Sequence, residues 1–226
     1  MREIEKPKGV LFDMDGVITT LDNNLLAWKI VFKKKTGIGM KDEDWYVLEG
    51  KSPPQIAEEI LKKYKHEISS QLVTDIATLK QYFFNKITSK KNVKLYPLVV
   101  EILTFLKESN IKLGLVTGSI LERVKGSLPE EVFALFDVFV TADEEMKKKP
   151  FPDPYLNAAA LLGFDTTVCW VIENAPLGIK SAKSAKCYCI GLLTTLKDQK
   201  KLSDAGADKI FKTHNELFAY FKSIFS

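Results

Sequence analysis

The chain is poor in cysteine and histidine and has no long hydrophobic run. Its three cysteines are an odd number, so we expect reduced thiols rather than a disulfide framework. A Cys-x-Cys pair with only two histidines in the whole chain makes a poor zinc site. The longest apolar runs fall far short of the ~20 residues that span a bilayer. The N-terminal stretch "MREIEKPKGVLFD" mixes acids with bases, so no secretory signal is expected.

Charge and composition exclude further classes of protein. The formal net charge is only +4, and the lysines lie in short clusters without interleaved aromatic residues, which argues against a nucleic-acid partner. No Gly-x-x-x-x-Gly-Lys stretch is present, so a P-loop kinase is excluded. With 46% hydrophobic and 27% charged residues, the chain has the composition of a folded globular protein. We therefore expect a cytoplasmic protein that binds neither membrane nor nucleic acid.

Short apolar runs alternate with helix-like segments over most of the chain. Strands are predicted at 9–15, 111–118, 137–141, 167–173 and 187–192. Helices are predicted at 97–110, 153–163, 175–186 and 214–225. Strands without polar alternation, separated by helices, are typical of a parallel sheet covered on both faces. The sequence therefore predicts an α/β fold, in which ligands bind at the carboxyl ends of the strands.

Residues 19–95 break this alternation. They contain three amphipathic helical segments and no strand, at 23–37, 53–65 and 69–87. "TTLDNN" and "SKKNVKLYP" flank them as hinge segments. We therefore expect a core of residues 1–18 and 96–226 with an inserted all-helical domain at 19–95.

Two carboxylates follow the first predicted strand. Asp13 and Asp15 lie two residues apart, and side chains at that spacing in an extended chain point to the same side. Gly16 then allows the backbone to turn tightly beside them. An acidic surface loop is the alternative for this pair taken by itself. The apolar strand before it and the inserted domain after it favour a functional site.

Hydroxyl, amide and cationic groups follow the later strands. Thr117, Gly118 and Ser119 end the strand in "LVTGS" and could hold a phosphate oxygen, although Thr117 or Ser119 could equally cap a helix. Lys149 opens "KPFPDPY", where two prolines restrict the chain around it. The pair Glu173-Asn174 ends the buried run "CWVI" and is either ordinary loop chemistry or one side of an ion site.

In this order, the motifs "FDMDGV", "LVTGS", "KPFPDPY" and "VIENAPLGI" resemble the four motifs of the haloacid dehalogenase-like hydrolase superfamily. The helical insert and "LEGKSPPQI" are similar to its β-phosphoglucomutase and phosphoglycolate phosphatase branch. The resemblance covers nearly the whole chain. It implies a Rossmann-like core with a mobile, four-helix cap domain.

The resemblance also implies a role for each residue. Asp13 would be the nucleophile that receives the phosphoryl group, and Asp15 the general acid and base. Thr117, with Gly118 and Ser119, would bind the phosphoryl group, whose charge Lys149 would neutralise. Mg²⁺ would be held by Asp13, the Asp15 backbone carbonyl, Glu173 and Asn174. These roles agree with the chemistry, because a carboxylate approaches a phosphate only where cations offset the repulsion, and oxygen ligands suit Mg²⁺.

The chain departs from the family pattern in three places. Asn174 stands where the branch usually has Asp, and Pro53 stands where the mutases carry a phosphate-binding arginine. The stretch "ITTLDNNLLAW" lacks the family's Asp-Thr and histidine. We therefore expect a phosphatase that acts on a small phosphorylated metabolite, as a monomer or weak homodimer. A β-phosphoglucomutase-like phosphomutase is one alternative. The other, favoured by Asn174, is a weakly active binding or regulatory protein.

Overall fold

The computed structural model describes residues 5–48, 51–88, 93–196 and 198–225. The chain divides into two compact units, one of residues 1–20 and 94–226 and the other of residues 21–93. Each unit lies within two residues of the expected core and insert. The difference arises because the two connecting segments pair with each other: Thr20 N donates to Lys94 O at 2.8 Å, and Tyr96 N donates to Ile18 O at 3.0 Å.

The first unit contains a six-stranded sheet whose paired strands all run parallel, with the order β3-β2-β1-β4-β5-β6. The strands are β1 (Gly9–Phe12), β2 (Lys112–Val116), β3 (Val138–Val140), β4 (Cys169–Glu173), β5 (Tyr188–Leu192) and β6 (Lys209–Phe211). The predicted Rossmann-like α/β fold is therefore confirmed. Strand β6 was not predicted, because it has only three residues, all partly exposed, and lacks an apolar run.

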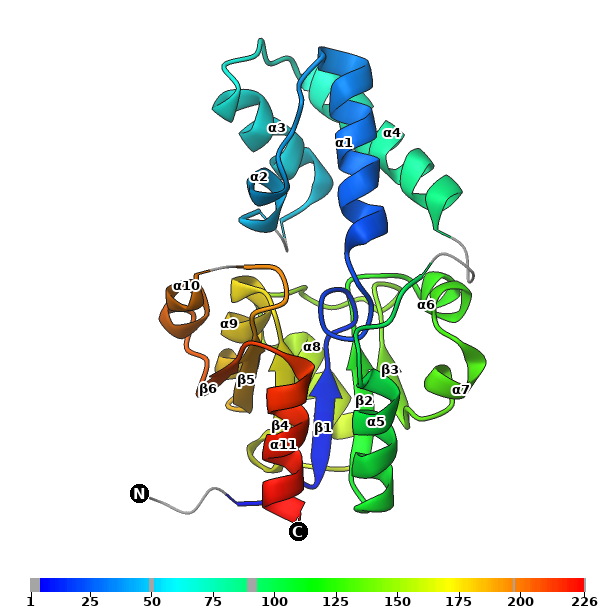
Figure 1. The fold of residues 1–226 in the computed structure, drawn as a ribbon, viewed down its shortest axis with the longest axis vertical. Helices are drawn as coiled ribbons and strands as arrows, with labels where there is room; N and C mark the ends of the chain where they lie inside the picture. The colour runs from blue at the N-terminus through cyan, green and yellow to red at the C-terminus, as the bar shows by residue number, and fades with distance from the viewer. Residues whose placement is uncertain (1–4, 49–50, 89–92, 197, 226) are drawn as a thin grey trace. The chain divides into compact units, whose positions relative to one another are not determined.

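Helices cover both faces of the sheet (Figure 1). Helices α5 (Val99–Glu108) and α11 (His214–Phe225) lie on one face, and α8 (Asp153–Leu161) and α9 (Pro176–Ser184) on the other. The short helices α6 (Leu121–Ser127), α7 (Glu130–Phe133) and α10 (Gln199–Asp204) and the 3₁₀ turn η1 (Thr166–Val168) complete this unit. Alternate residues of β1 serve the two faces: Val10 and Phe12 pack in the hydrophobic core with Leu103 and Phe221, whereas Leu11 lies against Gly114.

In its described residues, the second unit is helical, as predicted. It contains α1 (Asp22–Thr36), α2 (Asp42–Tyr46), α3 (Pro53–Lys63) and α4 (Ser70–Ile87). Their core includes Trp28, Phe32, Ile60 and Ile76. The five-residue helix α2 was not predicted, because it is too short to show a helical period. Part of the predicted hinge at 89–97, residues 89–92, lies outside the described residues. Nowhere in the described parts of the chain is a helix both long and apolar enough to cross a membrane.

Strand β1 is the point at which the strand order reverses. It pairs with β2 on one side and β4 on the other, and Phe12 lies opposite both Leu115 and Ile172. The register therefore brings Asp13 beside Glu173 one residue further on, where Asp13 N still donates to Ile172 O at 3.1 Å. Such a reversal point at the carboxyl ends of parallel strands is where α/β proteins bind ligands.

Candidate active site

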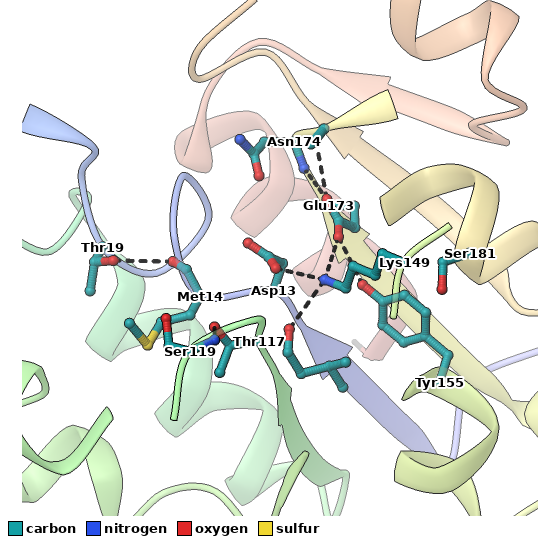
Figure 2. Close-up of polar contacts among 12 residues, drawn as sticks. Asp13, Met14, Thr19, Thr117, Ser119, Lys149, Tyr155, Glu173, Asn174 and Ser181 are labelled. Atoms are coloured by element: carbon teal, nitrogen blue, oxygen red, sulfur yellow. Dashed lines mark hydrogen bonds and ion pairs between the residues drawn. The ribbon is translucent and has the colours of Figure 1, made fainter. Parts of the chain in front are cut away.

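Lys149 joins three of the strands that meet at this edge (Figure 2). Its Nζ donates to Asp13 Oδ1 and to Glu173 Oε1, both at 2.7 Å, and to the carbonyl oxygen of Val116 at 3.2 Å. Burial lowers the pKa of Lys149, but the charges of Asp13 and Glu173 outweigh it, so the pKa lies above its usual value. Lys149 is therefore a fixed cation between two carboxylates.

Asp13 is one of the two carboxylates that pair with Lys149. Its pKa is raised to about 7: burial is the largest cause, the ion pair with Lys149 lowers the pKa, and the nearby charge of Glu173 raises it again. One lysine therefore does not offset the two carboxylates that it bridges, of which Glu173 is buried and Asp13 partly buried. An additional cation at Asp13 would favour the ionised form that a nucleophile needs.

The carboxylate of Glu173 is buried and hydrogen-bonded on both oxygens. Oε1 accepts from Lys149 and from Tyr155 Oη, the latter at 2.9 Å, and Oε2 accepts from the backbone N–H groups of Asn174 and Ala175 at 3.0 and 3.1 Å. Gly178 makes room for it, since a Cβ there would lie 1.7 Å from Oε1. Glu173 thus fixes Lys149 and the turn into α9; its predicted role as a metal ligand stays a prediction.

Asn174 lies fully buried against the turn that follows Asp15. Its Nδ2 donates to Thr195 Oγ1 at 3.3 Å. Gly16 has a φ of +98°, and a Cβ on it would lie 2.2 Å from Asn174 Nδ2 and 2.9 Å from Oδ1. Glycine is therefore required at position 16 both for the backbone conformation and for the close approach of the amide.

Thr117 and Ser119 form a tight turn after β2. Ser119 N donates to Thr117 Oγ1 at 3.1 Å, and Thr117 N donates to Val140 O at 2.9 Å. The alternative that one of these residues caps a helix is wrong, because α6 begins at Leu121, whose N–H is capped by Asp143 Oδ2 at 2.7 Å. Gly118 is exposed and its Cα faces open space. The turn thus presents an open backbone next to the Thr117 hydroxyl.

Asp15 has a different set of partners from Asp13. Its Oδ1 accepts from Thr19 Oγ1 at 3.1 Å, and its carboxylate forms an ion pair with Arg123 of α6 at 2.9 Å. Arg123 was not predicted as a site residue, and no local pattern in "LERVKGS" distinguishes it. Tyr155 was also missed, although it ends the motif "KPFPDPY" and could have been found there.

The oxygen atoms at this edge suit Mg²⁺. The predicted ligands are the carboxylates of Asp13 and Glu173, the amide of Asn174 and the backbone carbonyl of Asp15, and all are hard oxygen donors of the kind that Mg²⁺ takes. Within the described ranges, no group of three His, Cys, Asp or Glu side chains converges as a metal site. The metal site therefore stays a prediction.

The model of the haloacid dehalogenase-like hydrolase family matches residues 10–192. The chain belongs to this family. It is 32% identical over 197 residues to beta-phosphoglucomutase from Bacillus subtilis, covering 82% of this chain and 83% of that protein. It is 26% identical over 192 residues to hexitol phosphatase A from Escherichia coli, with 82% of each covered.

Two further matches concern fold and length. A crystal structure of beta-phosphoglucomutase from Clostridium difficile superimposes with a TM-score of 0.72 at 24% identity, over 97% of both chains, and shows the shared fold. The chain is also 28% identical over 212 residues to the Arabidopsis thaliana protein SUPPRESSOR OF QUENCHING 1, chloroplastic. That match covers 91% of this chain but only 19% of the plant protein.

Proposed function

We propose that the protein is a Mg²⁺-dependent phosphatase that hydrolyses small phosphomonoesters through an aspartyl-phosphate. The observation that carries the proposal is the Lys149 ammonium group fixed between Asp13 and Glu173 beside the Thr117 turn. A carboxylate held against a partly buried cation at an open backbone turn is an arrangement that lets an anionic nucleophile meet an anionic phosphate. Asp15, two residues away, supplies the second acid that an alkoxide leaving group requires.

The reaction follows in two steps. In the first, an oxygen of Asp13 forms a bond to phosphorus as the bond to the ester oxygen breaks, and protonated Asp15 gives its proton to that leaving oxygen. In the second, Asp15, now a carboxylate, takes a proton from water, whose oxygen bonds to phosphorus as the Asp13–phosphorus bond breaks. The alcohol leaves after the first step and inorganic phosphate after the second. Lys149 and the N–H groups of the Thr117 turn stabilise the charge on the phosphoryl oxygens.

Mg²⁺, held by Asp13, the Asp15 carbonyl, Glu173 and Asn174, would offset the negative charge of the phosphate when bound. Because Asn174 brings no charge, we expect binding weaker than at a site with a carboxylate in its place. Glu173 also binds Lys149 and the N–H groups of the turn. Asn174 is also the residue that favours the alternative of a weakly active binding protein.

A phosphomutase is the second candidate, because beta-phosphoglucomutase from Bacillus subtilis is among the relatives. The sequence resemblance places the mutases' phosphate-binding arginine where this chain has Pro53. Pro53 is the first residue of α3, which begins after the N-cap residue Ser52. A proline there has no charge with which to hold a second phosphate. The phosphatase is therefore the function that we propose.

The test measures phosphate release from a panel of phosphomonoesters, with and without Mg²⁺, for the wild type and for Asp13→Asn. An amide cannot form the acyl phosphate, so Asp13→Asn should lower turnover at least about a thousandfold. Asp204→Asn, at an exposed position on α10, is the control and should leave turnover unchanged. Near wild-type turnover by Asp13→Asn would overturn the nucleophile assignment. Conversion of glucose 1-phosphate to glucose 6-phosphate without phosphate release would favour the mutase.

A further inference from the structure

The two aspartates of the site are each paired with a different cation. Asp13 is bound by Lys149, from the loop before α8, and Asp15 is bound by Arg123, from α6. The charge of Asp15 raises the pKa of Asp13, because the two carboxylates repel each other. Separate cations offset this repulsion and draw the two carboxylates toward different partners.

Both terminal nitrogens of the Arg123 guanidinium are hydrogen-bonded. Nη2 donates to Asp15 Oδ1 at 3.1 Å and lies 2.9 Å from Oδ2, while Nη1 donates to Ser119 Oγ. Only 23% of the Arg123 side chain is exposed, against 25% for that of Asp15. A planar, forked donor between two fixed acceptors restrains orientation more than a flexible ammonium would. Thr19 Oγ1 holds Asp15 Oδ1 from a second direction.

These contacts argue against two other roles for Arg123. Its Nη groups face Asp15 and Ser119, so a substrate phosphate would have to displace Asp15 to reach them. A purely structural ion pair would not need to involve the one acid that the reaction uses. The Ser119 contact moreover joins Arg123 to the turn that presents Thr117, and so fixes Asp15 relative to the phosphate-binding residues.

We propose that Arg123 is a positioning residue that holds the Asp15 carboxylate in place for proton transfer. The proposal rests on the proposed function, because it assumes that Asp15 acts as general acid and base. It predicts that Arg123 contributes to turnover only through Asp15. It also predicts that substrate binding hardly depends on Arg123.

The test is a double-mutant cycle on hydrolysis of glycerol 2-phosphate, an alkyl ester that needs the acid, with saturating Mg²⁺. Arg123→Ala, Arg123→Lys and the control Lys125→Ala are each made in the wild type and in Asp15→Asn. Lys125→Ala removes the same charge from an exposed position on the same helix.

Misplacement of a catalytic group by about 1 Å lowers the reaction rate by up to about a hundredfold. We therefore expect Arg123→Ala to lower kcat between about tenfold and a hundredfold in the wild type, with KM nearly unchanged. Arg123→Lys should recover part of the loss, and Lys125→Ala should have no effect.

In Asp15→Asn, Arg123→Ala should change kcat by no more than about twofold, since its partner is already disabled. A second measurement compares 4-nitrophenyl phosphate with glycerol 2-phosphate in the wild-type background. There the loss of kcat from Arg123→Ala should be larger for the alkyl ester, which needs the acid more.

Three outcomes would each overturn the proposal: equal losses of kcat in both backgrounds, equal losses on both esters, or a rise in KM at constant kcat. A wild type without any turnover would instead refute the proposed phosphatase.

Discussion

Asp15 and Asp13 differ in surroundings although they are two residues apart. Asp13 is bound by Lys149, which also binds the Glu173 carboxylate, whereas Asp15 is bound by Thr19 and Arg123. We expect Asp15→Asn to keep the fold and to remove proton transfer. Because nitrophenol leaves without a proton, turnover should fall less for 4-nitrophenyl phosphate than for a sugar phosphate, where acid catalysis contributes about a hundredfold or more. Parallel kcat measurements check this, and equal losses would contradict the acid role.

In the proposed metal site, Asn174 would supply a neutral ligand where an aspartate would add a charge. An ion pair about 4 Å apart is worth at most ~4 kcal/mol at an effective dielectric of about 20, and a third of that is roughly tenfold in affinity. Asn174→Asp should therefore tighten Mg²⁺ binding by about tenfold or more. Calorimetric titration with MgCl₂ measures the affinity without turnover. Thr195→Val is a control for the contact with Asn174 Nδ2. An unchanged affinity would mean that the Asn174 side chain does not face the metal.

At the scale of elements, the turn after β1 is tied to distant parts of the core. Thr194 Oγ1, after β5, donates to Gly16 O at 2.6 Å, and His214 Nε2, at the start of α11, contacts Val17 O at 2.8 Å. The His214 ring also stacks on Tyr96, with ring centroids 4.9 Å apart. These contacts fix the carboxylates of the turn to the rest of the sheet.

His214 gives this arrangement a measurable pH dependence. Burial lowers the pKa of His214, and the hydrogen bond to Val17 offsets this only in part. Above the usual value of 6.5 both folded and unfolded chains hold it neutral. Below 6.5 the unfolded chain is protonated first, so the free energy of unfolding should fall by up to about 1.4 kcal/mol per pH unit, until the pH reaches the lowered pKa.

The measurement is urea unfolding of the wild type and of His214→Gln at several pH values between 7.5 and 5.0. The contribution of His214 is the difference between the two proteins in the slope of the free energy of unfolding against pH. Taking this difference cancels the contribution of Asp13, which both proteins share. The raised pKa of Asp13 makes the free energy of unfolding rise, not fall, as the pH is lowered. His66→Gln, at a partly exposed position in the second unit, is the matched control and should keep the wild-type slope. Identical slopes for the wild type and His214→Gln would show that His214 titrates alike in both states.

The elements also show what a sequence can predict here. Asp13, Thr117 and Glu173 each follow a strongly apolar strand, so their meeting at one sheet edge follows from chain order alone. The Asp15–Arg123 contact joins residues 108 positions apart, and nothing near Arg123 indicates it. Strand β6 was missed for another reason. Its short, partly exposed run is held by pairing with β5 rather than by its own pattern.

At the scale of the whole molecule, each unit has its own hydrophobic core. The cluster around β1, α5 and α11 takes all its residues from the first unit, and the cluster around Trp28 and Ile60 takes all of its residues from the second. The chain leaves and re-enters the first unit at Thr20 and Lys94, which are hydrogen-bonded to each other. The insert can therefore be removed without separating the ends that it joins.

We expect the first unit to fold when residues 21–93 are replaced by a short Gly-Ser linker. Thr20 N and Lys94 O lie only 2.8 Å apart, and a turn of two to four residues closes such a gap. The shortened protein should unfold cooperatively in urea, with an m value smaller by roughly one third, since m scales with the surface exposed on unfolding. It should still release phosphate from 4-nitrophenyl phosphate but lose selectivity among alkyl phosphates, since we expect the insert to carry substrate choice. Asp13→Asn in the shortened protein is the control for residual contaminating activity. A shortened chain that shows no cooperative transition would contradict the independence of the two cores.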